Sequence, residues 1–423
     1  MSVNEERSYH CLVVKFGGSS LADAPSILRA VKSVIEERSR GTQIAVVVSA
    51  MGKTTDHLLS TARQGCGSSS SLNELDDIIA MGERTSARVF AAALRARGER
   101  SIYLDPSDPD WPIITDDSFG NAKPILSVCD RIIEKSIQPL LNDGVTVVVP
   151  GFIGRTEKGE VTTMGRGGSD VTAMILARAL SADQIVLVTD VDGIMSADPK
   201  IIEKPRILSD IEIEVLARIA DSGSKFVHKK ALRYKSPLID VKIINNARAD
   251  LRSEGTIVRG SFPEGIMVES NPEASMAVTI TGKALSESPE TIQKVLQQIR
   301  EFNVPIFGMS INHDSLILYL PMNSSNKLLE SLHSIVTTDE RTIALAVRQN
   351  LAFISVKGLE LEETPGIVSV MSGALSSANI NIYGIFTITS SVLLFVDLRD
   401  KERAIQLTRD SIRKYTSLEE GEK

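Results

Sequence analysis

The stretch Val13-Val14-Lys15-Phe16-Gly17-Gly18-Ser19-Ser20 combines an apolar run, one lysine and two glycines near the start of the chain. The apolar run predicts a buried strand, and the glycines predict a turn directly after it. Backbone N–H groups that no side chain covers, with a lysine beside them, form a nest for an oxyanion or a phosphate. The order differs from that of a P-loop, in which the lysine follows the glycines. Taken alone, the stretch is equally typical of a strand with an ordinary connecting turn.

The composition narrows the class of protein. The chain has 423 residues, of which 42% are hydrophobic and 24% charged, and this length predicts two or three globular domains. The formal net charge of −7 argues against general binding to nucleic acid or to an anionic membrane. Cys11, Cys66 and Cys129 form no C-x-x-C pair, so neither a disulfide framework nor a metal site is expected. The polar start and the short apolar runs predict a soluble, cytoplasmic protein.

Apolar runs alternate with helical patterns up to about residue 260. The runs are continuous rather than alternating, as in strands that are buried on both faces. They are Leu12–Phe16, Gln43–Ser49, Val145–Pro150, Gln184–Asp190 and Val241–Ile244. A helix is predicted over Ser26–Arg38, a surface loop over Gln64–Ser71 and a β-hairpin over Phe152–Val161. We therefore expect residues 1–260 to form one α/β domain with a mostly parallel sheet between helices.

The rest of the chain contains an internal repeat. Residues of the same type recur 76 positions apart, at Gly282 and Gly358, Pro289 and Pro365, Asn303 and Asn379, and Gly308 and Gly384. Each copy predicts most of a ferredoxin-like unit, in residues 261–349 and 350–423. The first copy has a sixth strand at Thr342–Val347, but its counterpart falls in the charged segment Ser417–Lys423. One module would then keep an open edge that must be covered or paired with another chain, which predicts a homo-oligomer.

A second glycine-rich turn runs from Thr162 to Asp170 and leads into the apolar helix Val171–Leu180. Its backbone amides and the positive end of that helix form a second anion site. Arg166 has a planar guanidinium suited to a carboxylate or a phosphate, and Asp170 can cap the helix or orient a lysine. A solvated arginine beside a capping aspartate is the structural alternative.

Two further positions carry polar groups where ligands bind. Glu83 falls in the apolar stripe of a predicted helix over Asn73–Arg97, and a buried carboxylate needs a cation or donors. A substrate ammonium or a salt bridge within the protein would satisfy it. The strand Ile185–Asp190 ends in polar groups, and ligands of open α/β sheets bind outside such strand ends, although an ordinary Asp-Gly turn is the alternative.

Together these features favour phosphoryl transfer by positioning and charge neutralisation. The chain has 5 histidines and no Ser-His-Asp or Cys-His pattern, which an acceptor that needs no general base would explain. A carboxylate is ionised at neutral pH and can attack a γ-phosphate directly. Lys15, Lys225 and Mg²⁺ would offset its repulsion from the triphosphate.

Several of these segments, in this order, also match a known pattern. They are Lys15–Ser20, Ser49–Asp56, Gly82-Glu83, Gly151–Gly154, Gly165–Asp170, Thr189–Gly193 and Asp198-Pro199. With the repeat that follows, the chain resembles the aspartokinases. The resemblance implies an amino-acid kinase fold followed by tandem ferredoxin-like ACT domains.

The resemblance also implies roles for individual residues. The catalytic residues would be Lys15, which contacts the transferred phosphate, and Asp170, which orients Lys15. Glu83 would hold the ammonium of the substrate amino acid and Arg166 its α-carboxylate. The remaining substrate-binding residues would be Ser49, Thr55, Gly167 and Ser169. Nucleotide and phosphate would be bound by Lys15, Gly17, Gly18, Ser19, Thr189, Asp190 and Lys225.

The activity that follows from the resemblance uses ATP and Mg²⁺ to phosphorylate the β-carboxylate of L-aspartate. The product would be 4-phospho-L-aspartate, on the way to lysine, threonine and methionine. A related kinase acting on another carboxylate, or a regulatory subunit built from the ACT pair, are the alternatives. The segments 308–312 and 384–391 depart from the family's effector-binding pattern, so an amino-acid effector stays open.

Overall fold

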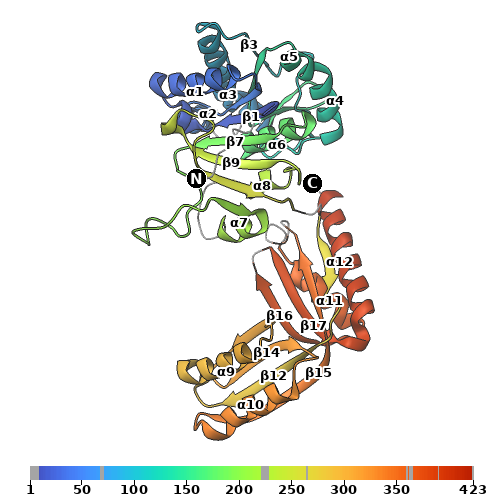
Figure 1. Ribbon diagram of the computed structural model, residues 1–423. Helices are drawn as coiled ribbons and strands as arrows, with labels where there is room; N and C mark the ends of the chain where they lie inside the picture. The colour runs from blue at the N-terminus through green and yellow to red at the C-terminus, as the bar shows by residue number, and fades with distance from the viewer. Residues whose placement is uncertain are drawn as a thin grey trace. The chain divides into compact units, whose positions relative to one another are not determined.

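The computed structural model describes residues 9–66, 71–220, 228–262, 265–358, 361, 365–388 and 390–421. The chain divides into two compact units, Met1–Phe262 and Pro263–Lys423 (Figure 1). Within the described residues, no helix has the length and apolar character needed to cross a membrane. Each unit is described by itself below.

The first unit is built on an eight-stranded sheet with β1 near its centre. In spatial order the strands are β3 (Ser101–Tyr103), β4 (Thr146–Pro150), β2 (Gln43–Val48), β1 (Cys11–Phe16), β7 (Gln184–Thr189), β9 (Asp240–Asn245), β10 (Thr256–Arg259) and β8 (Asp210–Glu212). Neighbouring strands are parallel from β3 to β9, and only β9 and β10 pair antiparallel. The predicted mostly parallel sheet is confirmed.

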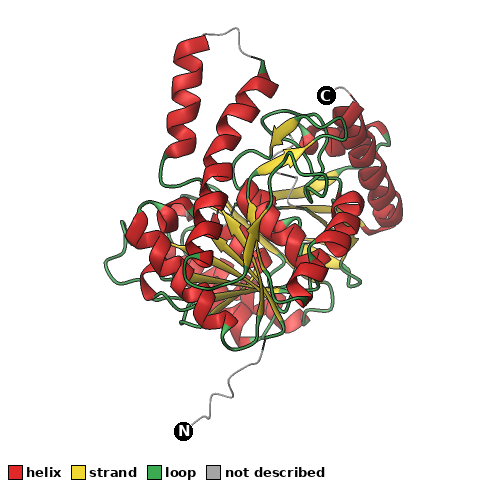
Figure 2. Cartoon of the chain, turned by 90° about the horizontal axis from the view of Figure 1, so that it is seen from above, coloured by secondary structure: helices red, strands yellow, loops and turns green. Residues whose placement is uncertain are grey.

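Helices cover both faces of this sheet, as the view in Figure 2 shows. They are α1 (Ala24–Arg38), α2 (Thr54–Cys66), α3 (Leu72–Arg95), α4 (Leu126–Ser136), α5 (Gln138–Asn142), α6 (Gly168–Ala179), α7 (Ile213–Ala220) and α8 (Lys229–Leu232). Leu12, Val14 and Phe16 of β1 belong to a core that also contains residues of α1 and α3. The ring of Phe16 lies 5.4 Å from that of Phe90 in α3. This packing holds α3 against the sheet at the level of the β1 turn.

Local signals set most element boundaries. Asp23 caps α1, because its carboxylate accepts a hydrogen bond of 2.8 Å from Ser26 N. The predicted hairpin is present as β5 (Ile153–Arg155) and β6 (Val161–Thr163), which pair antiparallel. The predicted loop is partly wrong, since α2 continues through residue 66 and Ser71 caps α3. Residues 67–70 of that loop lie outside the described residues.

The second unit contains both copies of the repeat in one sheet. Its strands are β11 (Met267–Ser270), β12 (Ser275–Gly282), β13 (Gly308–Ile311), β14 (Ser315–Pro321), β15 (Thr342–Lys357), β16 (Ile382–Ile388) and β17 (Ser391–Asp397). Its α-helices are α9 (Pro289–Glu301), α10 (Asn326–Thr338), α11 (Ile367–Ser377) and α12 (Lys401–Gly421). Each copy packs its own helices on a separate apolar core. The predicted pair of ferredoxin-like modules is present.

The 16-residue strand β15 joins the two modules. Its first half pairs with β12, and its second half pairs with β17 on one side and with β11 on the other. The expected open edge is therefore covered within the chain. β11 lies before β12, near the start of residues 261–349, and takes the place of the missing last strand of the second copy. The open-edge argument for a homo-oligomer is wrong, and the homo-oligomer stays a prediction.

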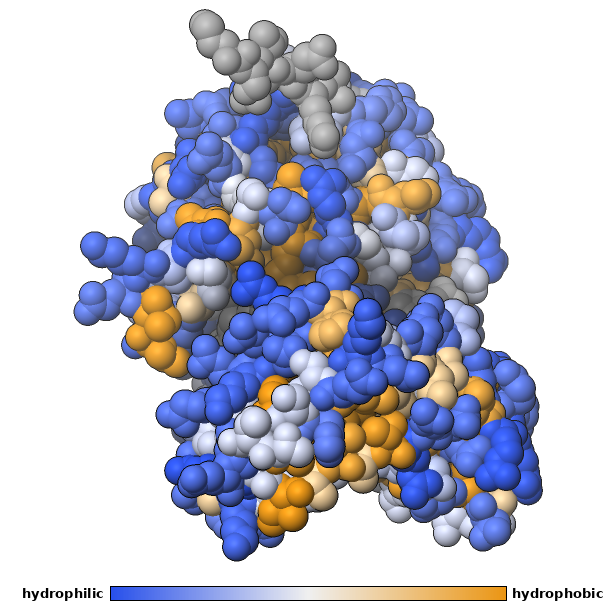
Figure 3. All heavy atoms as spheres, turned by 60° about the horizontal axis from the view of Figure 1, so that its bottom comes forward, coloured by the Kyte–Doolittle hydropathy of each residue, from blue (hydrophilic) through white to orange (hydrophobic). Residues whose placement is uncertain are grey.

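Apolar side chains also gather at the surface of this second unit (Figure 3). The exposed large apolar side chains are Ile306, Met309, Ile311, Ile343, Val347, Ile385 and Ile388. They come from β13, β15 and β16 or lie next to them. Exposed apolar groups of this kind are common at contacts between proteins.

Candidate functional site

A cleft of about 600 Å³ opens beyond the carboxyl ends of β1, β2 and β7. Ligands of parallel sheets bind at this edge, because loops leave all the parallel strands there. Nine residues predicted from the sequence line the cleft together, namely Lys15, Ser49, Thr55, Glu83, Arg166, Gly167, Ser169, Asp170 and Thr189. They come from seven different elements and turns, so the fold alone brings them to one place.

An ion pair crosses the floor of this cleft. Lys15 Nζ, on β1, lies 2.7 Å from Oδ1 of Asp170, in the first turn of α6. Both side chains are mostly buried, with 17% and 11% of their surface exposed. Asp170 therefore faces the lysine, which was one of its two sequence-based interpretations. Ser169 in the same turn accepts a hydrogen bond of 3.0 Å from the hydroxyl of Ser49, which joins the turn to the end of β2.

The glycine-rich turn before α6 needs its glycines. Gly165 and Gly167 have φ values of 67° and 78°, in the left-handed region that side chains disfavour. A Cβ at Gly167 would also lie 2.3 Å from Cβ of His228, another residue of the cleft. Arg166 between them is exposed and makes no hydrogen bond or ion pair with any residue the structure describes. Its guanidinium is thus open to an anionic ligand.

Glu83 is a buried carboxylate, and one of its two oxygens accepts no hydrogen bond from a described residue. It is 4% exposed, and Oε1 accepts a hydrogen bond of 3.1 Å from Ala50 N. Oε2 is buried and accepts no hydrogen bond among the described residues. Burial raises the pKa of Glu83 to about 7, and the Ala50 N–H group opposes this rise. Since the described residues supply no salt bridge, a cationic group of a ligand is the partner that fits.

Asp76 is a further carboxylate of this cleft, and sequence reasoning missed it. It lies on α3 and is 2% exposed. Its carboxylate accepts hydrogen bonds from Gly120 N, Thr163 N and the Thr163 hydroxyl. Burial raises its pKa although these donors lower it. The signal was available, because residues 76 and 83 fall on the same face of a helix.

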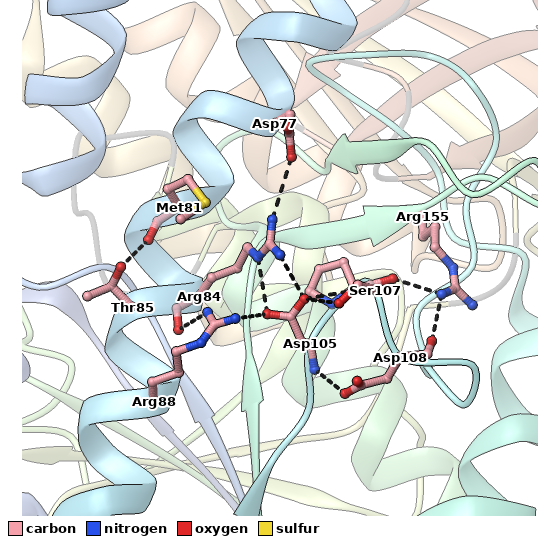
Figure 4. A network of polar contacts seen from close by, with 10 residues as sticks. Asp77, Met81, Arg84, Thr85, Arg88, Asp105, Ser107, Asp108 and Arg155 are labelled. Atoms are coloured by element: carbon pink, nitrogen blue, oxygen red, sulfur yellow. Dashed lines mark hydrogen bonds and ion pairs between the residues drawn. The ribbon is translucent and has the colours of Figure 1, made fainter.

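The outer side of α3 is held by a separate polar network (Figure 4). Asp105, after β3, accepts hydrogen bonds from Arg84 and Arg88, at 2.8 Å from Arg84 Nη2. Burial raises the pKa of Asp105, but the hydrogen bonds from Arg84 and Ser107 outweigh it and hold this pKa at about 2. Arg155 of the hairpin donates to two carbonyl oxygens of the loop that contains Asp105, those of Pro106 and Asp108. The network fixes the helix that carries Glu83 relative to the hairpin that precedes the glycine-rich turn.

The turn after β1, which we expected to bind an anion through its backbone N–H groups, offers only some of those groups. Gly17, Gly18 and Ser19 do not line the cleft. The Gly17 N–H group donates to Val188 O at 3.1 Å, so it is not free for an anion. Gly18 serves a close approach instead, since a Cβ there would lie 2.9 Å from Ala50 O.

The residues predicted to bind the nucleotide gather less completely than those predicted to bind the amino acid. Thr189 lines the cleft, whereas Asp190 does not and accepts a hydrogen bond from the Thr189 hydroxyl at 3.2 Å. Lys225 lies outside the described residues. No group of three His, Cys, Asp or Glu side chains among the described residues is placed to hold a metal ion.

The chain is similar in sequence to known kinases. The sequence profile of the amino acid kinase family matches residues 10–245. The aspartokinase of Mycolicibacterium smegmatis is 31% identical over 406 residues, which cover 92% of this chain and 93% of that protein. The aspartokinase of Geobacillus stearothermophilus is 30% identical over 389 residues, 88% of this chain and 89% of that protein. The chain belongs to the aspartokinase family. It is therefore an enzyme, a kinase within the amino acid kinase family.

Solved structures of aspartokinases share its fold. Aspartate kinase from Synechocystis matches 95% of this chain and 69% of its own, with a TM-score of 0.79 at 24% identity. E. coli aspartokinase III, in complex with aspartate and ADP, matches 95% of this chain and 99% of its own, with a TM-score of 0.55 at 22% identity. The predicted amino-acid kinase fold with tandem ACT-type modules is confirmed.

Proposed function

We propose that this aspartokinase transfers the γ-phosphoryl group of ATP to the β-carboxylate of L-aspartate, which yields 4-phospho-L-aspartate and ADP. One observation carries the substrate assignment. The cleft holds a buried carboxylate with an unused oxygen, Glu83, together with an arginine that has no partner among the described residues, Arg166. An amino acid has an ammonium and a carboxylate on one carbon, so it complements both groups.

In this arrangement Glu83 binds the substrate ammonium and Arg166 its α-carboxylate. Glu83 therefore favours a free amino group and disfavours N-acylated substrates, because acylation removes the charge that its buried oxygen requires. Ser49, Thr55, Gly167 and Ser169 complete the amino-acid pocket. The β-carboxylate then lies toward the Lys15 side of the cleft.

The acceptor needs no general base, because a carboxylate is already ionised at neutral pH. One of its oxygens forms the new bond to the γ-phosphorus while the bond from that phosphorus to the bridging oxygen breaks and ADP leaves. Lys15 offsets the negative charge that two approaching anions bring together. Asp170, 2.7 Å from the lysine, keeps Nζ directed into the cleft.

The nucleotide is assigned to Thr189, Asp190 and Lys225. Lys15, Gly18 and Ser19 lie at its phosphates in this assignment, and Gly17 shapes the turn through its hydrogen bond to Val188 O. Mg²⁺ supplies further charge neutralisation when it arrives bound to ATP, whose phosphate oxygens are its usual ligands. The product opens synthesis of lysine, threonine and methionine in this proposal, which also includes a homo-oligomer and an amino-acid effector at the ACT-type modules.

The test is an assay that traps acyl phosphate as a hydroxamate, with Mg-ATP and a panel of L-aspartate, L-glutamate and N-acetyl-L-aspartate. We expect product with L-aspartate, little with the other two, and loss of most of it in Lys15→Ala. Lys32→Ala, on the exposed face of α1, is the matched control and retains activity. Folded wild-type protein that makes no product from aspartate would refute the proposal, and turnover of glutamate alone would favour the related kinase.

A further inference from the structure

Asp76 connects α3 by hydrogen bonds to two other segments, at Gly120 and at Thr163. Its Oδ2 accepts from Gly120 N and from Thr163 N, each at 2.8 Å, and its Oδ1 accepts from the Thr163 hydroxyl at 2.6 Å. All three partners are donors, so they match an acceptor-only carboxylate. A buried carboxylate with this many donors is a strong and directional connection.

The connection joins the two halves of the amino-acid pocket. Thr163 is the last residue of β6, and Arg166 follows in the same turn. Asp76 and Glu83 lie on the same face of one rigid helix, about 10 Å apart along its axis. The hydrogen bonds between Asp76 and Thr163 thus tie the helix that carries Glu83 to the turn that carries Arg166.

The other side of this turn is held independently. Lys230 of α8 donates to Met164 O and to Asn121 Oδ1, both at 2.6 Å. Ala122 N donates to Thr163 O at 2.9 Å, so residues 120–122 and 163–165 form one connected layer. Asp76 reaches this layer from α3 through its side-chain hydrogen bonds.

We propose that Asp76 is a positioning residue that sets the spacing between Glu83 and Arg166, and so selects substrates that carry an ammonium and a carboxylate on the same carbon. This inference rests on the proposed function of the two groups. Asp76 acts through its neighbours and touches no reacting atom. Its removal leaves the Gly120 and Thr163 N–H groups without an acceptor in a buried place, and the turn then moves to find one.

The test compares steady-state kinetics for aspartate and for ATP in matched variants. Asp76→Ala removes all three contacts, and we expect KM for L-aspartate to rise about 10- to 100-fold while KM for ATP changes less than about twofold. The side chain in Asp76→Asn has the same shape and keeps one oxygen that both N–H groups can donate to. We therefore expect the KM for aspartate in this variant to stay close to the wild-type value. Asp77→Ala, on the same helix with 62% of the side chain exposed, is the control and stays as wild type.

Thr163 supplies a second pair of variants in case Asp76→Ala does not fold. Thr163→Val loses the hydroxyl contact and raises KM for aspartate several-fold, whereas Thr163→Ser keeps the contact and does not. Succinate, which lacks the ammonium, serves as a competitive inhibitor. It can bind Arg166 but has no cation for Glu83, so it does not depend on the spacing between the two. Its inhibition constant therefore changes far less than the aspartate KM in Asp76→Ala and Thr163→Val.

The outcomes separate this inference from the proposed function. A wild-type enzyme without aspartate kinase activity overturns both. An active wild type whose Asp76→Ala and Thr163→Val variants keep the aspartate KM overturns the inference alone. So does an equal rise in the aspartate KM, the ATP KM and the succinate inhibition constant, since general loosening of the cleft would produce it.

Discussion

Lys15 on β1 and Asp170 on α6 form an ion pair of 2.7 Å that closes the floor of the cleft. The two residues are distant in sequence. They meet because β1 pairs with β7 in the parallel sheet, and α6, which leads into β7, starts at the edge where β1 ends. In the proposed function, the lysine is thereby held where the substrate carboxylate and the γ-phosphate meet. This pair is the basis of the first prediction.

Asp170→Asn is expected to lower kcat about 10- to 100-fold, because Lys15 loses the charge that directs it while the amino-acid pocket stays intact. KM for aspartate changes little. Asp130→Asn is the control, since that carboxylate pairs with Arg178 at the far end of α6, at 2.7 Å. Steady-state kinetics measure both variants, and an unchanged kcat in Asp170→Asn would contradict the assigned role.

Replacing Arg166 tests whether the site needs a planar guanidinium or only a positive charge. Arg166→Ala should raise KM for aspartate about 10- to 100-fold, because a charge-assisted pair to the α-carboxylate is lost. Arg166→Lys should recover part of this loss only, since an ammonium does not reproduce the two parallel hydrogen bonds of a guanidinium. Full recovery in Arg166→Lys would show that charge alone suffices.

Glu83 should make the stability of the protein depend on pH. Its pKa is about 7 in the folded protein against an ordinary value of 4.5, so the folded protein holds more protons than the unfolded chain between these values. Stability therefore falls as pH rises through this window, by at most about 3 kcal/mol from this group. Glu83→Gln should flatten that fall and be more stable than wild type at about pH 8, as urea unfolding at two pH values would show.

The same titration predicts how aspartate binding depends on pH. The substrate ammonium requires ionised Glu83, and the ionised fraction grows about tenfold between pH 6 and pH 8. KM for L-aspartate should fall by about this factor and level off above the pKa of about 7. Glu83→Gln should show a high KM without this dependence. A wild-type KM that is flat over the range would assign the ammonium to another group.

Gly82 predicts a steric effect on the same pocket. A Cβ at this position would lie 2.9 Å from Cβ of Ala50, whose N–H group donates to Glu83. Gly82→Ala should push α3 from this contact, lower stability by about 1–3 kcal/mol and raise KM for aspartate. Gly373→Ala in α11 meets no atom within 4 Å and should instead stabilise its helix by about 0.5–1 kcal/mol. Calorimetry and kinetics on both variants test the contrast.

Much of the architecture follows from local patterns. The continuous apolar runs of β1, β2, β4, β7 and β9 identified a parallel sheet, and the 76-residue repeat identified two similar modules. What the repeat could not show was the source of the last strand. β11 pairs with β15 across about 85 residues of chain, and strand pairing at that separation depends on which edges meet after folding.

For the candidate site, too, some features follow from the sequence and others only from the tertiary structure. Sequence patterns alone determined that a lysine precedes a glycine turn, that a second glycine turn carries Arg166, and that Glu83 lies on an apolar helix face. Only the tertiary structure decided the partners: Asp170 for Lys15, none among the described residues for Glu83 Oε2, and Thr163 with Gly120 for Asp76. The physical reason is that residue type and periodicity set which side chains are buried. Which donor meets a buried acceptor is set by elements that are distant in sequence and come together only when the sheet and its loops pack.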